Sequence, residues 1–510
     1  MLASMPPLLL PTPRSVKLTG GAASVNVNPD VMGSIGSGSV VSEGTGAGGY
    51  RLVISPHTPH VQLQVQSEAA LRSARATLRQ LVRQYGRNLP CMEIQDAPAF
   101  ATRGVMLDVS RDKVPTTSML DEAAGAFAAL KMNHLQLYTE HTFAYAGHDE
   151  VWLDCSPITP GEARDFDASC KKIGMTLAPN QNCFGHLHKW LKLHRYAHLA
   201  ETQGDWVFME WPRSGPFSLC PGEPGSIELV RDMLTQLCPC FDAPMLNIGC
   251  DETFDIGQGR SRDAAQERGR AAVYFDFVDQ IADISRELGK RPMMWADIAL
   301  SHPEMLNRFP KDAVGLAWGY EPDSDFAQWC DLLVCHGIEP WVCPGTSSWR
   351  SITGRTSERR TNIDNAGKAA RRGAKGYLVT DWGDMGHHQH WPIALNAIAH
   401  AAQAAWNPSA PVDHRAVSLH VFGDELLQLS GWLDTLGNVD LHIRQVGGGR
   451  SLDDARPIRN ASAMFRDLHR ADPLPDPIPS TIEMWEEAAA NLLACESSVP
   501  ASLDRGSLVG

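Results

Sequence analysis

The middle of the chain, over residues 99–409, alternates between short apolar runs and longer stretches with helical spacing. Buried strands have roughly four to eight residues and helices about ten or more, so the short runs are predicted to be strands. Eight strand–helix units in about 300 residues is the number that closes a (β/α)8 barrel. We therefore predict an α/β protein with a TIM barrel. The predicted strands are residues 104–109, 134–138, 176–179, 245–248, 292–297, 314–320, 339–343 and 376–382.

The segments on either side of the predicted barrel have different patterns. Residues 61–65 alternate apolar and polar side chains, and residues 67–85 carry apolar side chains at helical spacing. Residues 1–98 are therefore predicted to form a small N-terminal α+β domain, with a Gly- and Ser-rich loop over residues 33–49. Residues 410–510 are predicted to form a C-terminal helical region.

Composition and charge exclude several classes of protein. The 510 residues are 43% hydrophobic and 20% charged, which is typical of a globular protein. A formal net charge of -14 disfavours a nucleic-acid surface, so a neutral sugar or another small molecule is the expected partner. No run of about 18 apolar residues exists, so no membrane contact is expected. Homo-oligomer formation is left open.

The cysteines and the first residues indicate a compartment. Twelve cysteines are scattered along the chain, and Cys183, Cys250 and Cys343 lie in or beside apolar strand-like runs. This pattern favours reduced, buried thiols over a disulfide framework. The first residues lack a basic segment, and prolines break their apolar stretch, so no secretory signal is expected. The sequence therefore predicts a cytoplasmic protein.

The fourth predicted strand ends in two adjacent carboxylates, Asp251 and Glu252. Ligands of parallel α/β proteins bind at the carboxyl ends of the strands. Two acids side by side cannot both ionise cheaply, so one pKa should rise, and a protonated acid can protonate a leaving group. Neighbouring side chains on a regular strand point to opposite faces. Both acids reach one site only if the strand end is irregular, which Gly249 permits.

Polar and aromatic side chains also stand at the ends of the other predicted strands. Aromatic rings stack on the apolar faces of sugars, and carboxylates and amides bond their hydroxyl groups. One tryptophan alone is more often part of a core, but four at corresponding strand ends indicate a carbohydrate site. Arg103 precedes the first strand and Arg111 follows it. The other candidates are Glu140, His186, Trp295, Asp297, Trp318, Tyr320, Trp349, Trp382 and Asp384.

Several of these stretches resemble glycoside hydrolase family 20, the β-N-acetylhexosaminidases. The resemblance covers about residues 50–400 and includes an α/β domain before the barrel. Two positions depart from the family pattern: Glu140-His141 stands where the family often has Asp, and Asp384 where it often has Glu. No tyrosine is evident after strand seven, so Tyr320 is the candidate for the acetamido contact. The similar stretches are residues 103–111, 131–138, 185–186, 248–252 and 382–384.

The resemblance implies a reaction and a role for each residue. An exo-acting enzyme would release terminal β-linked N-acetylglucosamine or N-acetylgalactosamine with retention, and the 2-acetamido group of the substrate would replace a protein nucleophile. Asp251 would hold the acetamido N–H, and Glu252 would protonate the leaving oxygen. Trp295, Trp318 and Trp382 would surround the acetamido methyl group. Arg103 and Asp384 would bind sugar hydroxyls, and His186 would orient a carboxylate.

Two alternatives remain open on the sequence alone. One is a sugar-binding barrel without catalysis, against which the presence of both Asp251 and Glu252 argues. The other is a metal-dependent hydrolase that uses the histidines near the strand ends. A catalytic zinc ion needs three fitted ligands, and these histidines form no consistent set, so neither a metal nor a cofactor is expected. The histidines are His141, His186, His188, His387 and His388.

Overall fold

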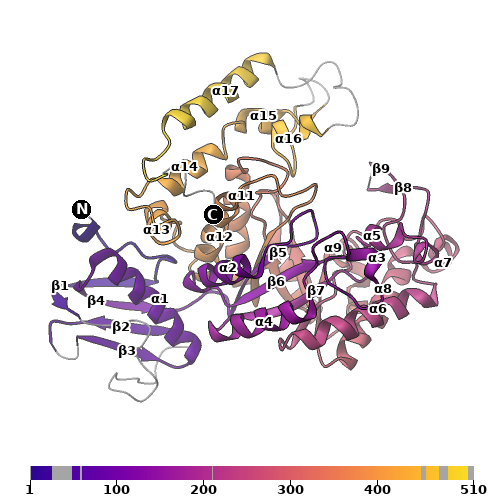
Figure 1. The fold of residues 1–510 in the computed structure, drawn as a ribbon, viewed down its shortest axis with the longest axis horizontal. Helices are drawn as coiled ribbons and strands as arrows, with labels where there is room; N and C mark the ends of the chain where they lie inside the picture. The colour runs from indigo at the N-terminus through magenta and orange to yellow at the C-terminus, as the bar shows by residue number, and fades with distance from the viewer. Residues whose placement is uncertain are drawn as a thin grey trace.

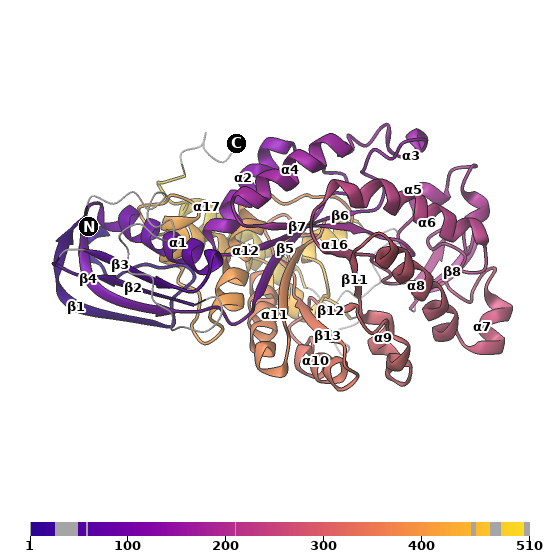
Figure 2. The same cartoon turned by 90° about the horizontal axis from the view of Figure 1, so that it is seen from below.

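The computed structural model describes residues 2–25, 49–57, 60–209, 211–449, 455–469 and 481–503. Nearly all of the loop expected over residues 33–49 lies outside these ranges. The chain forms, in order, an N-terminal sheet, a barrel and a group of C-terminal helices (Figure 1). In both views the N-terminal sheet lies at one end of the long axis of the molecule (Figure 2).

The N-terminal part is a four-stranded antiparallel sheet with the strand order β1-β4-β2-β3. Helix α1 (Glu68–Tyr85) packs Leu71, Leu78 and Leu81 in one apolar cluster with β2, β3 and β4. Sequence periodicity identified α1 and β3, whereas β1 and β4 were not predicted. The strands are β1 (Ser15–Ser24), β2 (Tyr50–Ile54), β3 (Val61–Val65) and β4 (Asn88–Asp96).

Eight parallel strands close into a barrel, which confirms the predicted fold class. Strand β14 pairs with β5, and every predicted run contributes one strand. In the interior, Met106, Trp341 and Leu378 belong to one buried apolar cluster. The strands are β5 (Thr102–Asp108), β6 (His134–Thr139), β7 (Thr176–Gln181), β10 (Met245–Asn247), β11 (Arg291–Trp295), β12 (Val314–Trp318), β13 (Glu339–Cys343) and β14 (Gly376–Asp381).

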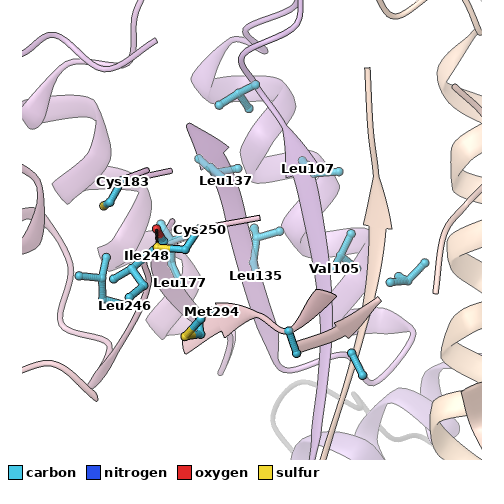
Figure 3. Packing of buried hydrophobic residues seen from close by; sticks show 14 of the residues in the cluster. Val105, Leu107, Leu135, Leu137, Leu177, Cys183, Leu246, Ile248, Cys250 and Met294 are labelled. Carbon is cyan, nitrogen blue, oxygen red and sulfur yellow. Dashed lines mark hydrogen bonds between the residues drawn. The ribbon is translucent and has the colours of Figure 1, made fainter. Parts of the chain in front are cut away.

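The apolar side chains on the outer faces of the barrel strands pack beneath helices. Figure 3 shows Val105 and Leu107 of β5 beside Leu135 and Leu137 of β6, all in the largest buried cluster. The helices are α2 (Thr117–Ala129), α3 (Asp149–Trp152), α4 (Pro160–Lys172), α5 (His188–Leu191), α6 (Pro224–Leu237), α7 (Arg262–Arg268), α8 (Arg270–Glu287), α9 (Asp297–Ser301), α10 (Phe326–Cys335), α11 (Thr356–Lys368) and α12 (Trp391–Trp406).

Three further features complete the fold. Between β7 and α6 the chain forms a hairpin of β8 (Asp205–Phe208) and β9 (Trp211–Ser214), which was not predicted. Short 3-10 turns occur at Leu2–Ser4, Ala197–Leu199, Cys238–Cys240, Pro303–Arg308 and Ala369–Arg372. The C-terminal helices are α13 (His414–His420), α14 (Leu429–Leu436), α15 (Leu441–Val446), α16 (Ala463–Leu468) and α17 (Ile482–Ser497). Among the described residues, every helix is too short or too polar to cross a membrane.

The N-terminal domain attaches to the amino-terminal end of the barrel through Asp96, at the end of β4. Its carboxylate accepts hydrogen bonds from Lys131 Nζ at 3.0 Å and from Trp406 Nε1 at 2.8 Å. Lys131 precedes β6, and Trp406 ends α12. The amino-terminal end is therefore covered by protein, and the carboxyl ends of the strands form the opposite end.

Candidate active site

The backbone after β10 is irregular at the two adjacent carboxylates. Gly249, Cys250 and Glu252 have φ values of +70°, +71° and +54°, all in the left-handed region. A Cβ atom at position 249 would lie 2.6 Å from Asn182 Cγ, so only glycine fits there. These turns interrupt the alternation of a regular strand, and Asp251 and Glu252 both reach one side of the site.

His186 lies against both carboxylates. Its Nε2 atom is 3.2 Å from Asp251 Oδ2 and 3.5 Å from Glu252 Oε2. Gly185 permits this approach, because a Cβ atom there would lie 2.8 Å from the backbone oxygen of Asp251. Burial opposes the charged imidazolium, but the two carboxylates outweigh it and raise the pKa of His186 to about 9. The histidine is therefore cationic near neutral pH.

Asp251 remains ionised although it is buried. Burial acts to raise its pKa, but the His186 imidazolium and a hydrogen bond from Asn182 outweigh it and hold the pKa below the usual range. Asn182 Nδ2 donates to Asp251 Oδ1 at 2.7 Å. Asn182 was not among the predicted site residues, because an amide side chain does not titrate.

Glu252 has the opposite protonation preference. Burial raises its pKa to about 8, with further increases from Asp251, Asp297 and Asp384 and a partial offset from His186. Its backbone amide donates to Asp297 Oδ2 at 3.0 Å, and burial raises the pKa of Asp297 to about 7. At neutral pH the site therefore holds a charged Asp251 beside a protonated Glu252, which is the division expected for adjacent acids.

Arg111 organises the polar groups at the ends of β5 and β6. Its guanidinium lies 2.9 Å from both Asp108 Oδ2 and Glu140 Oε1 and packs over the ring of Tyr138. Tyr138 also donates to Glu140 Oε1 at 2.9 Å. Burial acts to lower the pKa of Arg111, but the two carboxylates hold it well above its usual value. Asp384 also belongs to this polar group. Burial raises the pKa of Asp384, and the charge of Arg111 partly offsets that increase.

The assignment of Arg103 to the substrate site is wrong. Its side chain donates to the carbonyl oxygens of Lys131, Phe100 and Ala101 at 2.8–2.9 Å and packs over Trp406. Arg103 lies near the start of β5, at the end covered by the N-terminal domain. Seven residues at about 3.3 Å each put the two ends of this strand roughly 20 Å apart. Arg111, at the other end of β5, is the arginine in the site.

Four aromatic side chains form a wall within the barrel. Trp295 and Trp382 have ring centroids 5.9 Å apart, and Trp318 stacks on Tyr320 at 5.2 Å. Trp382 Nε1 donates to the Tyr320 hydroxyl at 2.7 Å, which joins the two pairs. Trp349 packs its edge on Tyr320 and donates to Asn460 Oδ1 at 2.8 Å, so it supports the wall from behind.

The other candidate histidines point to separate partners. His188 Nδ1 lies 3.1 Å from the Pro216 carbonyl, and His387 Nε2 lies 3.0 Å from that of Asp108. His388 Nε2 faces the carbonyl of Met385, and burial lowers the pKa of His141 to about 4. Within the described residues, one group has three potential metal-ligand atoms within 4.8 Å of one another: His186, Asp251 and Glu252.

Known proteins resemble this chain in sequence and in fold. Residues 15–97 match the family model "Glycosyl hydrolase family 20, domain 2". Hexosaminidase D of Homo sapiens is 28% identical over 446 residues, 79% of this chain and 87% of that protein. A crystal structure of a β-N-acetylhexosaminidase has a TM-score of 0.66 at 17% identity and covers 84% of this chain and 96% of its own. The structure of a family 20 exo-β-N-acetylglucosaminidase from Vibrio harveyi has a TM-score of 0.64 at 18% identity. It covers 84% of this chain and 78% of its own.

The barrel, the split pair of acids and the aromatic wall define a glycoside-hydrolysing barrel enzyme. The solved structures are too distant in sequence to show more than the fold. The resemblance to a family rests on the family model and on the similarity to hexosaminidase D. The chain resembles glycoside hydrolase family 20, through the match of residues 15–97 to that family's domain 2 and through its similarity to hexosaminidase D.

Proposed function

We propose that this protein is an exo-acting, retaining β-N-acetylhexosaminidase. Its substrate would be a terminal β-linked N-acetylglucosamine or N-acetylgalactosamine of a glycan or glycoconjugate. The names of its relatives support the activity, and the opposite protonation preferences of Asp251 and Glu252 are the observation that carries the mechanism. A protonated acid beside a charged partner suits a reaction that needs one proton donor and one stabilising anion.

The placement of the two acids favours a nucleophile supplied by the substrate. One imidazole lies within 3.5 Å of both carboxylates, so they approach from the same side. A protein nucleophile and an acid would instead lie about 5–5.5 Å apart with the sugar between them. The carbonyl oxygen of the 2-acetamido group would attack the anomeric carbon as the glycosidic bond breaks, and Glu252 would donate its proton to the leaving oxygen.

Asp251 and Glu252 then act on the cyclic intermediate. The oxazolinium ion carries a positive charge, which the Asp251 carboxylate would stabilise while it accepts the acetamido N–H. Glu252, now ionised, would take a proton from water, and the water oxygen would attack the same carbon. The ring reopens and the acetamido group is restored, so the sugar leaves with its original configuration.

The remaining residues provide recognition of the terminal sugar. Trp295, Trp318 and Trp382 would enclose the acetamido methyl group, and the Tyr320 hydroxyl would face its carbonyl. Arg111, Glu140 and Asp384 offer charged partners for ring hydroxyls. Arg111 takes the role that the resemblance had given to Arg103.

The test compares p-nitrophenyl β-glycosides that carry a 2-acetamido or a 2-hydroxyl group. We expect turnover of the first and at least about 100-fold lower kcat/KM for the second, because the internal nucleophile is missing. A thiazoline analogue of the intermediate should inhibit far more strongly than free N-acetylglucosamine. Equal kcat/KM values would refute the mechanism. Binding without turnover would indicate a sugar-binding protein, and loss of activity with a chelator would indicate a metal enzyme.

A cytoplasmic location is also proposed. All twelve cysteines are free thiols, as is common in reducing compartments. Cell fractionation tests the location, and recovery of the protein from the secreted fraction would overturn it.

A further inference from the structure

A cavity of about 220 Å³ lies outside the barrel, between the ends of strands β5 and β14 and the helices α2 and α12. The two helices lie side by side in both views, and the rings of Phe127 in α2 and Trp391 in α12 have centroids 6.2 Å apart (Figures 1 and 2). Most of the cavity wall is apolar. It includes Leu107, Met119, Leu120, Ala126, Trp391 and Leu395.

A buried carboxylate lies at the strand end of the cavity. Asp381, the last residue of β14, lines the cavity and is 3% exposed. Its Oδ1 atom accepts hydrogen bonds from Thr346 Oγ1 at 2.6 Å and from Ser348 Oγ at 2.7 Å. Among the described residues, no donor bonds its Oδ2 atom, and no Lys, Arg or His forms an ion pair with it. Burial of a carboxylate without a cation is costly, so a cation in the cavity would be stabilised.

Gln389 provides a second acceptor, and its orientation is fixed. The Ser348 hydroxyl donates to Asp381, so it can only accept from Gln389, whose Nε2 atom donates to it at 3.2 Å. The other amide atom, Oε1, is buried and has no hydrogen-bond partner in the described part of the chain. Gln389 lines the cavity and is 6% exposed. A donor inside the cavity would satisfy this oxygen.

The cavity opens on the solvent side of α2. Glu122 and Met119, which is 40% exposed, line it there, and the half-buried Lys113 lies in the loop before the helix. The opening therefore carries one charge of each sign and favours neither cations nor anions. The charge preference of the cavity comes from Asp381, at its inner end.

His387 connects the cavity wall to the group of charges around Arg111. Its Nε2 atom donates to the backbone carbonyl of Asp108 at 3.0 Å. A Cβ atom at Gly383 would lie 2.6 Å from His387 Nε2 and 2.7 Å from Arg111 Cβ, so both side chains pack against this glycine. His387 lines the cavity and Arg111 does not. The cavity is thus separate from the candidate active site, although the two lie close together.

We propose that this cavity binds a small organic ammonium ion with an apolar body. Asp381 and Gln389 both bond the hydroxyl of Ser348, so one ammonium group, with three N–H donors, can reach both acceptors. The apolar body would fill the space between α2 and α12. An uncharged alcohol would leave the carboxylate without a counter-ion, and an anion would be repelled by it. Binding here needs no substrate and is independent of the proposed function.

Calorimetric titration with three ligands of similar shape tests the proposal. Benzylamine is cationic near neutral pH, benzyl alcohol is neutral and benzoate is anionic. We expect benzylamine to bind with a Kd of about 1 mM or below, benzyl alcohol at least about tenfold more weakly, and benzoate not measurably. Equal Kd values for the amine and the alcohol, or no binding of the amine, would overturn the proposal.

Two substitutions in the cavity and one matched control locate the site. Asp381→Asn retains an acceptor for Thr346 and Ser348 but removes the charge, so the Kd of benzylamine should rise about tenfold. Ala126→Leu fills the cavity and should abolish binding. Ala129→Leu makes the same change at an exposed position of α2 outside the cavity, and the Kd should stay the same. Thermal unfolding shows which variants are folded, and Ala126→Leu decides if Asp381→Asn is not.

The candidate active site also holds carboxylates, so a further variant separates the two sites. Asp251 does not line the cavity, and Asp251→Asn should therefore leave the Kd of benzylamine unchanged. Equal increases of the Kd in Asp251→Asn and Asp381→Asn would place the amine among the catalytic acids and overturn the proposal. An unchanged Kd in both Asp381→Asn and Ala126→Leu would also refute the cavity as its site.

Discussion

Arg103 and Arg111 lie at the two ends of strand β5, and their surroundings differ. Arg103 donates to three backbone carbonyl groups, and burial lowers its pKa to about 10. Arg111 lies between two carboxylates that hold its pKa well above the usual value. At the covered end backbone carbonyl groups hold the charge of Arg103, whereas the carboxyl ends of the strands, the mouth of the barrel, gather titratable groups whose pKa values are shifted in both directions. This difference indicates where structure is stabilised and where chemistry takes place.

Glu252→Gln should have the largest effect on the mouth. We expect it to fold normally and to lose about 10²–10⁴-fold in kcat on an unactivated glycoside, because no proton reaches the leaving oxygen. Steady-state kinetics and a urea denaturation curve measure the two properties. Activity within threefold of the wild type would remove Glu252 from the proposed role.

Asp251→Asn should have the next largest effect. The carboxylate opposes a charge that appears only along the reaction, so kcat should fall about 10²–10³-fold while KM changes little. The same change at an exposed acid, Asp323→Asn, is the control; Asp323 pairs with Arg459 on the surface, and its loss should leave kcat and KM unchanged. An effect of Asp251→Asn confined to KM would show that Asp251 only binds the ground state.

The same conservative change at both ends of β5 tests the comparison directly. Arg111→Lys cannot bridge two carboxylates in the same way, so kcat/KM should fall about 10–100-fold, the effect of a lost charge-assisted hydrogen bond. Arg103→Lys should leave kcat/KM unchanged and lower the free energy of unfolding by about 1–3 kcal/mol, because buried carbonyls lose donors. The opposite pattern would reverse the assignment of the two ends.

The pH dependence of kcat/KM should reflect the opposite pKa shifts of Asp251 and Glu252. The acid form of Glu252 is the active form, so log kcat/KM should decrease as the pH rises through about 8. Asp251 must be charged, so the acid limb should lie below the usual range of an aspartic acid. Residual activity of Glu252→Gln should lack the alkaline limb near 8. A limb that persists unchanged there would belong to another group.

The sequence predicted the barrel because its signals are local. Each strand is a short apolar run, and the acids at the end of β10 are adjacent in the chain. The hairpin β8–β9 escaped prediction because its strands have four residues each and one contains Pro212. Strand β1 escaped because Gly20 and Gly21 interrupt it.

Only part of the candidate site could be predicted from the sequence, whereas every strand of the barrel was predicted. The irregular strand end at Gly249 follows from the need to bring two neighbouring acids together. The hydrogen bond from Asn182 to Asp251 joins the ends of β7 and β10. The spacing of residues along one strand does not reveal which other strand lies beside it. Arg103 was chosen on family resemblance, although the direction of a parallel strand puts its first residues at the end opposite the site.

The central claim is that the substrate's acetamido oxygen is the nucleophile beside Asp251 and Glu252. The most direct test is a series of p-nitrophenyl N-acetyl-β-glucosaminides with zero, one, two or three fluorine atoms on the acetamido methyl group. Fluorine withdraws electrons from the attacking oxygen, so kcat/KM should decrease at each step and be at least about 100-fold lower for the trifluoro compound. A flat series, or a glycosyl ester trapped on any Asp or Glu, would contradict the claim.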